Sequence, residues 1–142
     1  MAESVPGTSL ETAAAEALRG AGSADADLTI ALTDDAHIQT LNRDYLGHDS
    51  PTDVLSFPAG ERDPETGALY LGDVVISVPR ASAQAGEAGH SLEAEVQLLV
   101  VHGVLHLLGH DHAEAEDKER MWAAQAEALE RLGLGGINIR EG

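Results

Sequence analysis

The run HGVLHLLGHDH, which begins at His102, constrains this chain more than any other segment. His102 and His106 are four residues apart, so a helix through them places both imidazoles on one face, one turn apart. Gly109 can adopt the left-handed conformation that ends a helix, which brings His112 toward the same point from another direction. Three histidine ligands leave one position of a tetrahedral ion open to water, as in catalytic zinc sites. The run therefore predicts one divalent metal ion, Zn²⁺, bound by His102, His106 and His112.

Two alternatives stay open at this run. Histidines on an apolar helix are often hydrogen-bonded core or surface residues, and the glycine turn followed by a third histidine is what favours metal binding here. His110 follows Gly109 directly and competes with His112 for the third position. The chain contains no cysteine, so thiolate ligands, disulfides and cysteine nucleophiles are excluded.

The charge of the chain argues against general nucleic-acid binding. Its 142 residues, a length that suits one domain, include 25 Asp and Glu but only 8 Lys and Arg, a formal net charge of -17. Such a surface repels phosphate backbones, so DNA is not an expected partner, although a metal ion in a cleft creates a local positive site. The amino-terminal segment does not resemble a signal peptide, and no apolar run reaches membrane-spanning length. We therefore expect a cytoplasmic protein without membrane contact.

Hydrophobic periodicity and turn residues predict both helices and strands. Pro58 is expected to end the second strand, and Gly72 marks a bulge or a close backbone approach in the third. The helix that carries the histidines is apolar on more than one face, so it should be buried. The predicted helices are 8–20, 34–45, 79–84 with an end near Gly86 or Gly89, 91–109 and 114–132, and the predicted strands are 27–33, 54–57 and 68–78.

A second polar cluster lies just before and inside the strand predicted at 54–57. Thr52 and Asp53 precede this strand, and Ser56 lies within it between two apolar residues. All three are candidate substrate-binding residues. The alternative for Thr52 and Asp53 is turn capping, and the alternative for Ser56 is a hydroxyl satisfied by the backbone.

Together these segments resemble the YbeY family of metal-dependent rRNA maturation endoribonucleases. The resemblance rests on LN-x2-Y-x3-D-x2-TDVLSFP from Leu41, LGDVVIS from Leu71, GHS from Gly89 and VHGVLHLLGHDH ending at His112, and it is strongest over residues 27–132. It implies a single α+β domain over residues 1–142, with a small mixed β-sheet packed by helices and a zincin-like metal helix. It also implies zinc at the three histidines, with His112 rather than His110 as the third ligand. The implied activity is single-strand-specific RNA cleavage in small-subunit rRNA maturation and ribosome quality control, with the small subunit or its proteins as partners.

The chain departs from the family pattern at one position that matters for catalysis. Many members carry arginine directly after the aromatic residue of the first segment, whereas this chain has Leu46. Arg43 is the nearest basic side chain and the candidate catalytic replacement. Asp111, beside His112, is a candidate catalytic residue that could orient a histidine ligand of the metal ion. The alternative role for Asp111 is turn capping.

Three functions remain open at this point. For RNA cleavage, the metal ion would act as a Lewis acid or generate hydroxide from bound water. A second possibility is another metal-dependent hydrolase, acting on peptides. Gly103 argues against it, because zinc proteases of the H-E-x-x-H type have their glutamate at that position. A third possibility is a ribosome-assembly factor with little catalytic activity.

Overall fold

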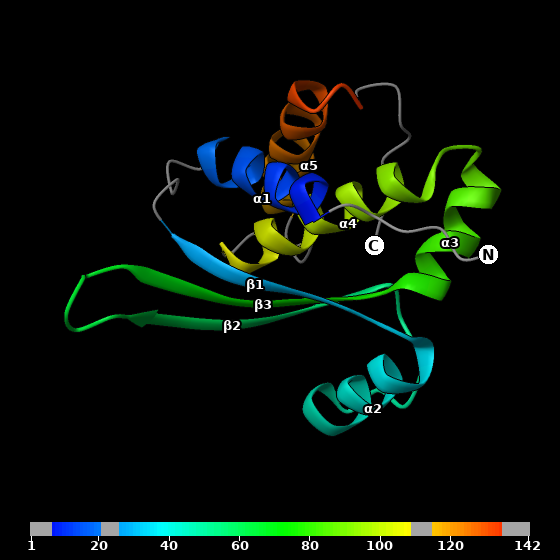
Figure 1. Cartoon of the computed structure of the whole chain (residues 1–142), viewed down its shortest axis with the longest axis horizontal. Coiled ribbons are helices and arrows are strands. Elements are labelled where there is room, and N and C mark those ends of the chain that lie inside the picture. The colour runs from blue at the N-terminus through cyan, green and yellow to red at the C-terminus, as the bar shows by residue number, and fades with distance from the viewer. Residues whose placement is uncertain (1–6, 21–25, 109–114, 135–142) are drawn as a thin grey trace.

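A small sheet of three strands with helices on both faces forms the framework (Figure 1). The computed structural model describes residues 7–20, 26–108 and 115–134. The predicted α+β class, a small mixed sheet packed by helices, is confirmed. The elements are α1 (Gly7–Gly20), β1 (Asp27–Thr33), α2 (Asp35–Leu46), β2 (Val54–Arg62), β3 (Leu69–Ser77), α3 (Val78–Ala88), α4 (Leu92–Leu107) and α5 (Ala115–Arg131).

The central strand, β3, pairs with β1 in parallel and with β2 in antiparallel register. Its residues alternate between two cores, because successive side chains of a strand point to opposite faces. Val74 and Ile76 join the larger core with α1, α4 and α5. Val75 instead packs with Leu55 and with Ile38 of α2, which lies on the other side of the sheet (Figure 1). The sheet therefore separates α2 from α4.

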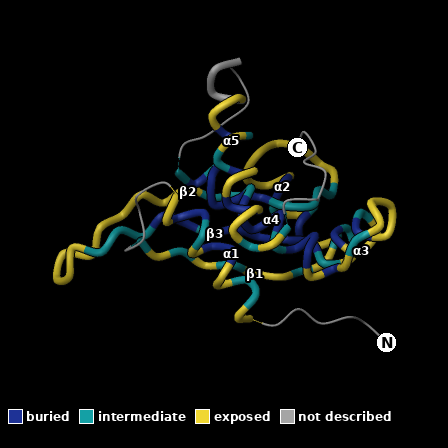
Figure 2. Tube along the Cα trace, turned by 90° about the horizontal axis from the view of Figure 1, so that it is seen from above, coloured by how far each residue is buried: buried dark blue, intermediate teal, exposed yellow. Residues whose placement is uncertain are grey.

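Helix α4 runs through the centre of the larger core. Twelve of its sixteen residues are buried, and they belong to the dark blue centre of the molecule in Figure 2. The prediction of a buried helix is thereby confirmed. Ser91 caps its amino terminus, where the side chain accepts a hydrogen bond from the backbone N–H of Ala94. The helix ends at Leu107 with Leu108 as its cap, before the predicted end at Gly109, which lies outside the described residues.

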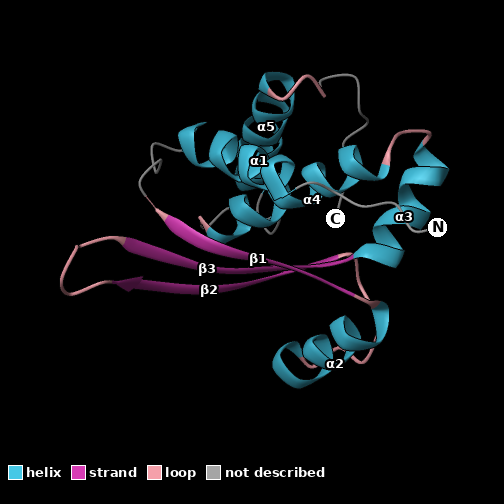
Figure 3. Cartoon of the chain, in the orientation of Figure 1, coloured by secondary structure: helices cyan, strands magenta, loops and turns pink. Residues whose placement is uncertain are grey.

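The prediction that Pro58 ends the second strand is wrong. β2 continues to Arg62, and the β2–β3 hairpin extends well beyond the helices (Figure 3). Proline fits here because β2 is an edge strand and its register shifts just after Pro58, where an absent N–H disrupts no ladder. Opposite Pro58, Gly72 has a φ of 139°, and a Cβ there would lie 2.1 Å from the carbonyl oxygen of Phe57. The predicted close backbone approach at Gly72 is confirmed.

Several other helix ends lie at or within a few residues of their predicted positions. Asp34 caps α2, accepting a hydrogen bond from the backbone N–H of His37, and Gly89 ends α3 in the left-handed conformation. α5 begins and ends within one residue of its predicted bounds. No helix in the described ranges is long and apolar enough to cross a membrane.

A polar contact ties α2 to the end of β3. Ser77 is fully buried, and its Oγ donates to Asp35 Oδ1 at 2.6 Å while also accepting from the backbone N–H of Arg80. The hydrogen bond from Ser77, and secondarily the guanidinium of Arg80, lower the pKa of the Asp35 carboxyl below its ordinary value against the opposing effect of desolvation. The contact thus links the amino termini of α2 and α3.

Replacing Asp35 should reduce stability only where this carboxyl is ionised. A lowered native pKa contributes stability above the unfolded pKa of about 3.9 and loses it as pH falls through the native value. Because the side chain is 41% exposed, we expect Asp35→Asn to cost about 0.5–1 kcal/mol near neutral pH. Urea unfolding of both proteins from pH 7 to pH 3 measures this difference, which should shrink below about pH 5. A difference that stays constant to pH 3 would contradict the assignment.

Candidate active site

The site begins with a close approach of α4 to the sheet. Gly103 is buried, and a Cβ at this position would lie 2.7 Å from Val74 Cγ1 and 3.2 Å from Ser56 Oγ. Ser56 Oγ donates to the carbonyl oxygen of Gly103 at 3.0 Å. The backbone alternative predicted for this hydroxyl is therefore what the structure shows. Because the sheet fills the space beside Gly103, no glutamate side chain fits where a zinc protease has its base.

His102 and His106 lie one turn apart on α4 with their rings edge to face. Their Nε2 atoms are 3.1 Å apart, and their ring centroids are separated by 4.6 Å. Two ligands of a tetrahedral zinc ion, with Zn–N bonds of about 2.0–2.1 Å, lie about 3.3 Å from each other. The two imidazoles therefore fit adjacent positions around one such ion. This pairing agrees with the helical spacing predicted for His102 and His106.

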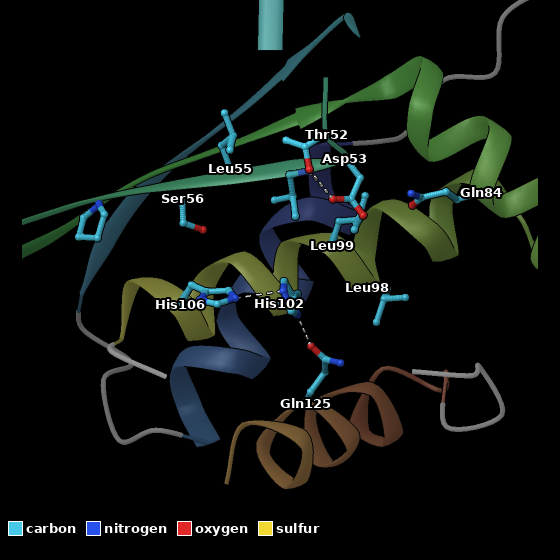
Figure 4. Close-up of a pocket in the computed structure, with 12 residues that line it drawn as sticks. Thr52, Asp53, Leu55, Ser56, Gln84, Leu98, Leu99, His102, His106 and Gln125 are labelled. Carbon is cyan, nitrogen blue, oxygen red and sulfur yellow. Dashed lines mark hydrogen bonds between the residues drawn. The ribbon is translucent and has the colours of Figure 1, made fainter. Parts of the chain in front are cut away.

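Gln125 of α5 holds the first of these histidines. Its side chain is 3% exposed, and His102 Nδ1 donates to Gln125 Oε1 at 2.9 Å (Figure 4). With the proton on Nδ1, the lone pair of Nε2 is available for a metal ion, an arrangement common around metal-binding histidines. Sequence reasoning missed this residue. A signal was present, because Gln125 lies midway between Met121 and Leu129 on the apolar face of α5.

A pocket of about 470 Å³ opens between β2, α3, α4 and α5 in front of the two histidines (Figure 4). It brings together the histidine pair, Gln125 and the three predicted substrate-binding residues, Thr52, Asp53 and Ser56. The described residues that line it are Thr52, Asp53, Val54, Leu55, Ser56, Pro58, Gln84, Leu98, Leu99, His102, His106 and Gln125. Asp53 Oδ1 also accepts a hydrogen bond from the backbone N–H of Val54 at 2.8 Å. Asp53 therefore both makes the local backbone contact that was predicted as its alternative role and lines the pocket.

The remaining predicted site residues do not meet in this pocket. Arg43 lies on α2, across the sheet from α4, where its Nε donates to Asp44 at 3.0 Å. Leu46, at the end of the same helix, is 48% exposed. His110, Asp111 and His112 lie outside the described residues, and within the described part of the chain no group of three His, Asp or Glu side chains could hold a metal ion. Of the three predicted metal ligands, His102 and His106 therefore lie among the described residues.

Comparison with known proteins assigns this chain to a protein family. The family model described as "Endoribonuclease YbeY" matches residues 4–133. The chain belongs to the endoribonuclease YbeY family. The predicted resemblance is confirmed, and the class of enzyme predicted from it, a hydrolytic endoribonuclease, is the class of this family.

Several relatives support the family assignment over most of the chain. The endoribonuclease YbeY of Pelotomaculum thermopropionicum is 50% identical over 129 residues, which cover 88% of this chain and 85% of that protein. The endoribonuclease YbeY of Carboxydothermus hydrogenoformans is 54% identical over 108 residues, covering 75% of this chain and 73% of that protein. A solution structure of a Thermotoga maritima protein matches the fold with a TM-score of 0.58 at 25% identity, covering 99% of this chain and 95% of that one.

Adding one methyl group at Gly103 should be costly, because it meets Val74 and forces α4 away from the sheet. We expect Gly103→Ala to lower the free energy of unfolding by about 1–3 kcal/mol. The matched control is Gly86→Ala in α3, where nothing lies within 4 Å of the added Cβ. This control should gain about 0.5–1 kcal/mol from helix propensity and a less flexible unfolded chain. Urea unfolding checks both variants, and a Gly103→Ala protein as stable as the wild type would contradict the packing described.

Proposed function

We propose that this protein is a zinc-dependent, single-strand-specific endoribonuclease. One zinc ion is held by His102 and His106 together with His112, and the substrate is small-subunit ribosomal RNA during maturation and ribosome quality control. The observation that carries the proposal is the 3.1 Å separation of the two Nε2 atoms at a pocket wall, in a chain of the endoribonuclease YbeY family.

The residues around the pocket suit this chemistry in distinct ways. When bound there, the metal ion supplies positive charge that stabilises a phosphodiester as negative charge grows on it. Gln125 fixes the ring orientation and the proton of His102. The contact of Ser56 with Gly103 fixes α4 against β2, so the histidine pair faces the pocket from a rigid helix. The filled space beside Gly103 disfavours the peptidase alternative.

The charge of the chain bears on how it reaches RNA. A net charge of -17 repels a phosphate backbone over the Debye length of about 8–10 Å, so diffusion to free RNA is not assisted. We propose that a basic ribosomal protein of the small subunit presents the RNA, because opposite charge steers association between proteins. Work on ribosomal RNA would place the protein in the cytoplasm.

Removing a histidine of the pair should abolish both metal binding and cleavage. In His106→Ala, we expect substoichiometric zinc and at least a roughly 100-fold lower rate on single-stranded RNA, because electrostatic stabilisation of the developing charge is lost. Elemental analysis and a cleavage assay on the same preparation provide the measurements. His37→Ala, an exposed histidine of α2 across the sheet, is the matched control and should retain both properties.

Three outcomes would count against the proposal. A nuclease-free His106→Ala protein that cuts RNA at the wild-type rate would place the chemistry elsewhere. Histidine-dependent hydrolysis of a peptide library, without RNA cleavage, would favour the peptidase alternative. Retained ribosome binding with no hydrolysis by the wild type would indicate an assembly factor instead.

Gln125 should affect the metal ion without touching it. Gln125→Leu removes the acceptor for His102 Nδ1–H, so the ring loses its fixed orientation, and we expect zinc affinity to fall by about 10–100-fold. Gln125→Glu keeps an acceptor at this position and should retain tight binding. Competition with a chromogenic chelator measures both affinities. Equal affinities for the leucine variant and the wild type would show that Gln125 does not support the ligand.

A further inference from the structure

The charge of the described pocket wall is unusual for a site that receives a phosphodiester. Among its lining residues, Asp53 is the single carboxylate, and none is a lysine or an arginine. A carboxylate accepts hydrogen bonds and repels phosphate oxygens. Any direct contact of the Asp53 carboxylate with RNA is therefore expected to be with a hydrogen-bond donor of the RNA and not with its phosphate.

Asp53 is held in place by more than a local turn. Its Oδ1 accepts from the backbone N–H of Val54 at 2.8 Å and from Thr52 Oγ1 at 3.4 Å. When the Gln84 amide is oriented to satisfy both of its groups, its nitrogen donates to Asp53 Oδ2 at 3.3 Å. An ionised carboxylate has about four acceptor positions, so these three donors leave room for one donor from a ligand.

The Gln84 amide is itself anchored in the core. Its nitrogen also donates to Glu95 Oε2 at 3.0 Å, and the other Glu95 oxygen contacts His90 Nε2 at 2.6 Å. Glu95 is completely buried on α4, about two turns before His102. A chain of four polar side chains therefore runs from Asp53 on the pocket wall to His90. Such a connection favours one position of the Asp53 carboxylate, which suits recognition of a ligand group at a defined place.

We infer that Asp53 accepts a hydrogen bond from a donor group of the bound RNA and thereby determines specificity. The donor is either a ribose 2′-hydroxyl, which DNA lacks, or an amino group of a base. Thr52 and Gln84 act as positioning residues for this carboxylate. The inference rests on the endoribonuclease function proposed above and assigns Asp53 a role in choosing the nucleotide rather than in the chemical step.

A scan of modified RNA substrates tests this contact in the metal-loaded wild-type protein. One set of single-stranded oligonucleotides carries a single 2′-deoxynucleotide at each position in turn. A second set replaces guanosine by inosine, adenosine by purine riboside, or cytidine by its 4-deamino analogue, the pyrimidin-2-one riboside, to remove one base amino group at a time. One modification should lower kcat/KM by about 10- to 100-fold, the loss expected for a hydrogen bond to a charged acceptor. The set that contains it identifies the donor.

Asp53→Asn provides the second arm of a double-mutant cycle. In this variant, the same modification should cause little further loss, because the accepting carboxylate is gone. A 2′-hydroxyl that acts as nucleophile would instead remain essential in both proteins. The matched control is Asp49→Asn, an exposed carboxylate outside the pocket that accepts from Gln39 Nε2 at 3.0 Å, and it should keep the wild-type pattern.

The outcomes separate this inference from the function on which it rests. If the wild type cleaves unmodified RNA but no modification lowers kcat/KM, the inference is overturned and the proposed function stands. An equal loss in wild type and Asp53→Asn also overturns it. If the wild type does not cleave unmodified RNA, both fall together. The scan of the wild type decides the matter even if Asp53→Asn fails to fold.

Discussion

The contact between α4 and the sheet at Gly103 is the constraint on which the rest of the structure depends. A glycine there lets the helix backbone approach Val74 and accept a hydrogen bond from Ser56. This contact places His102 and His106, which lie on either side of Gly103 in the sequence, at the wall of the pocket next to β2. Close packing also makes the helix stiff, since twelve of its residues are buried. Such rigid placement suits the metal site that we propose for these two histidines.

The polar groups of the site come from elements far apart in the chain. β2 contributes Ser56, and Asp53 lies just before this strand, while α3 and α5 contribute Gln84 and Gln125. The two glutamines have parallel roles, because Gln84 contacts the Asp53 carboxylate and Gln125 contacts the His102 imidazole, each through a side-chain hydrogen bond. Side-chain amides suit this role, since an amide both donates and accepts without adding a charge to the site.

Charges act differently on the exposed surface of the molecule and inside the pocket. Most of the acidic residues that the structure describes are exposed, where salt screens their charge within about 10 Å. Inside the pocket the balance is set by a few groups at short range, where water screens less. A divalent cation held by the histidines would share the pocket with the carboxylate of Asp53, so charges of both signs would line it. The global charge therefore says little about what this site attracts.

Sequence alone determined the local features of this protein. The spacing of His102 and His106 and the strand at residues 27–33 follow from helical and strand periodicity, which depends only on near neighbours. Only the tertiary structure decided that Pro58 lies within an edge strand and that Gln125 reaches His102. It also decided that Arg43 lies across the sheet from the pocket. These outcomes depend on which faces pack together, and that choice is made by contacts between residues distant in sequence, which no local pattern records.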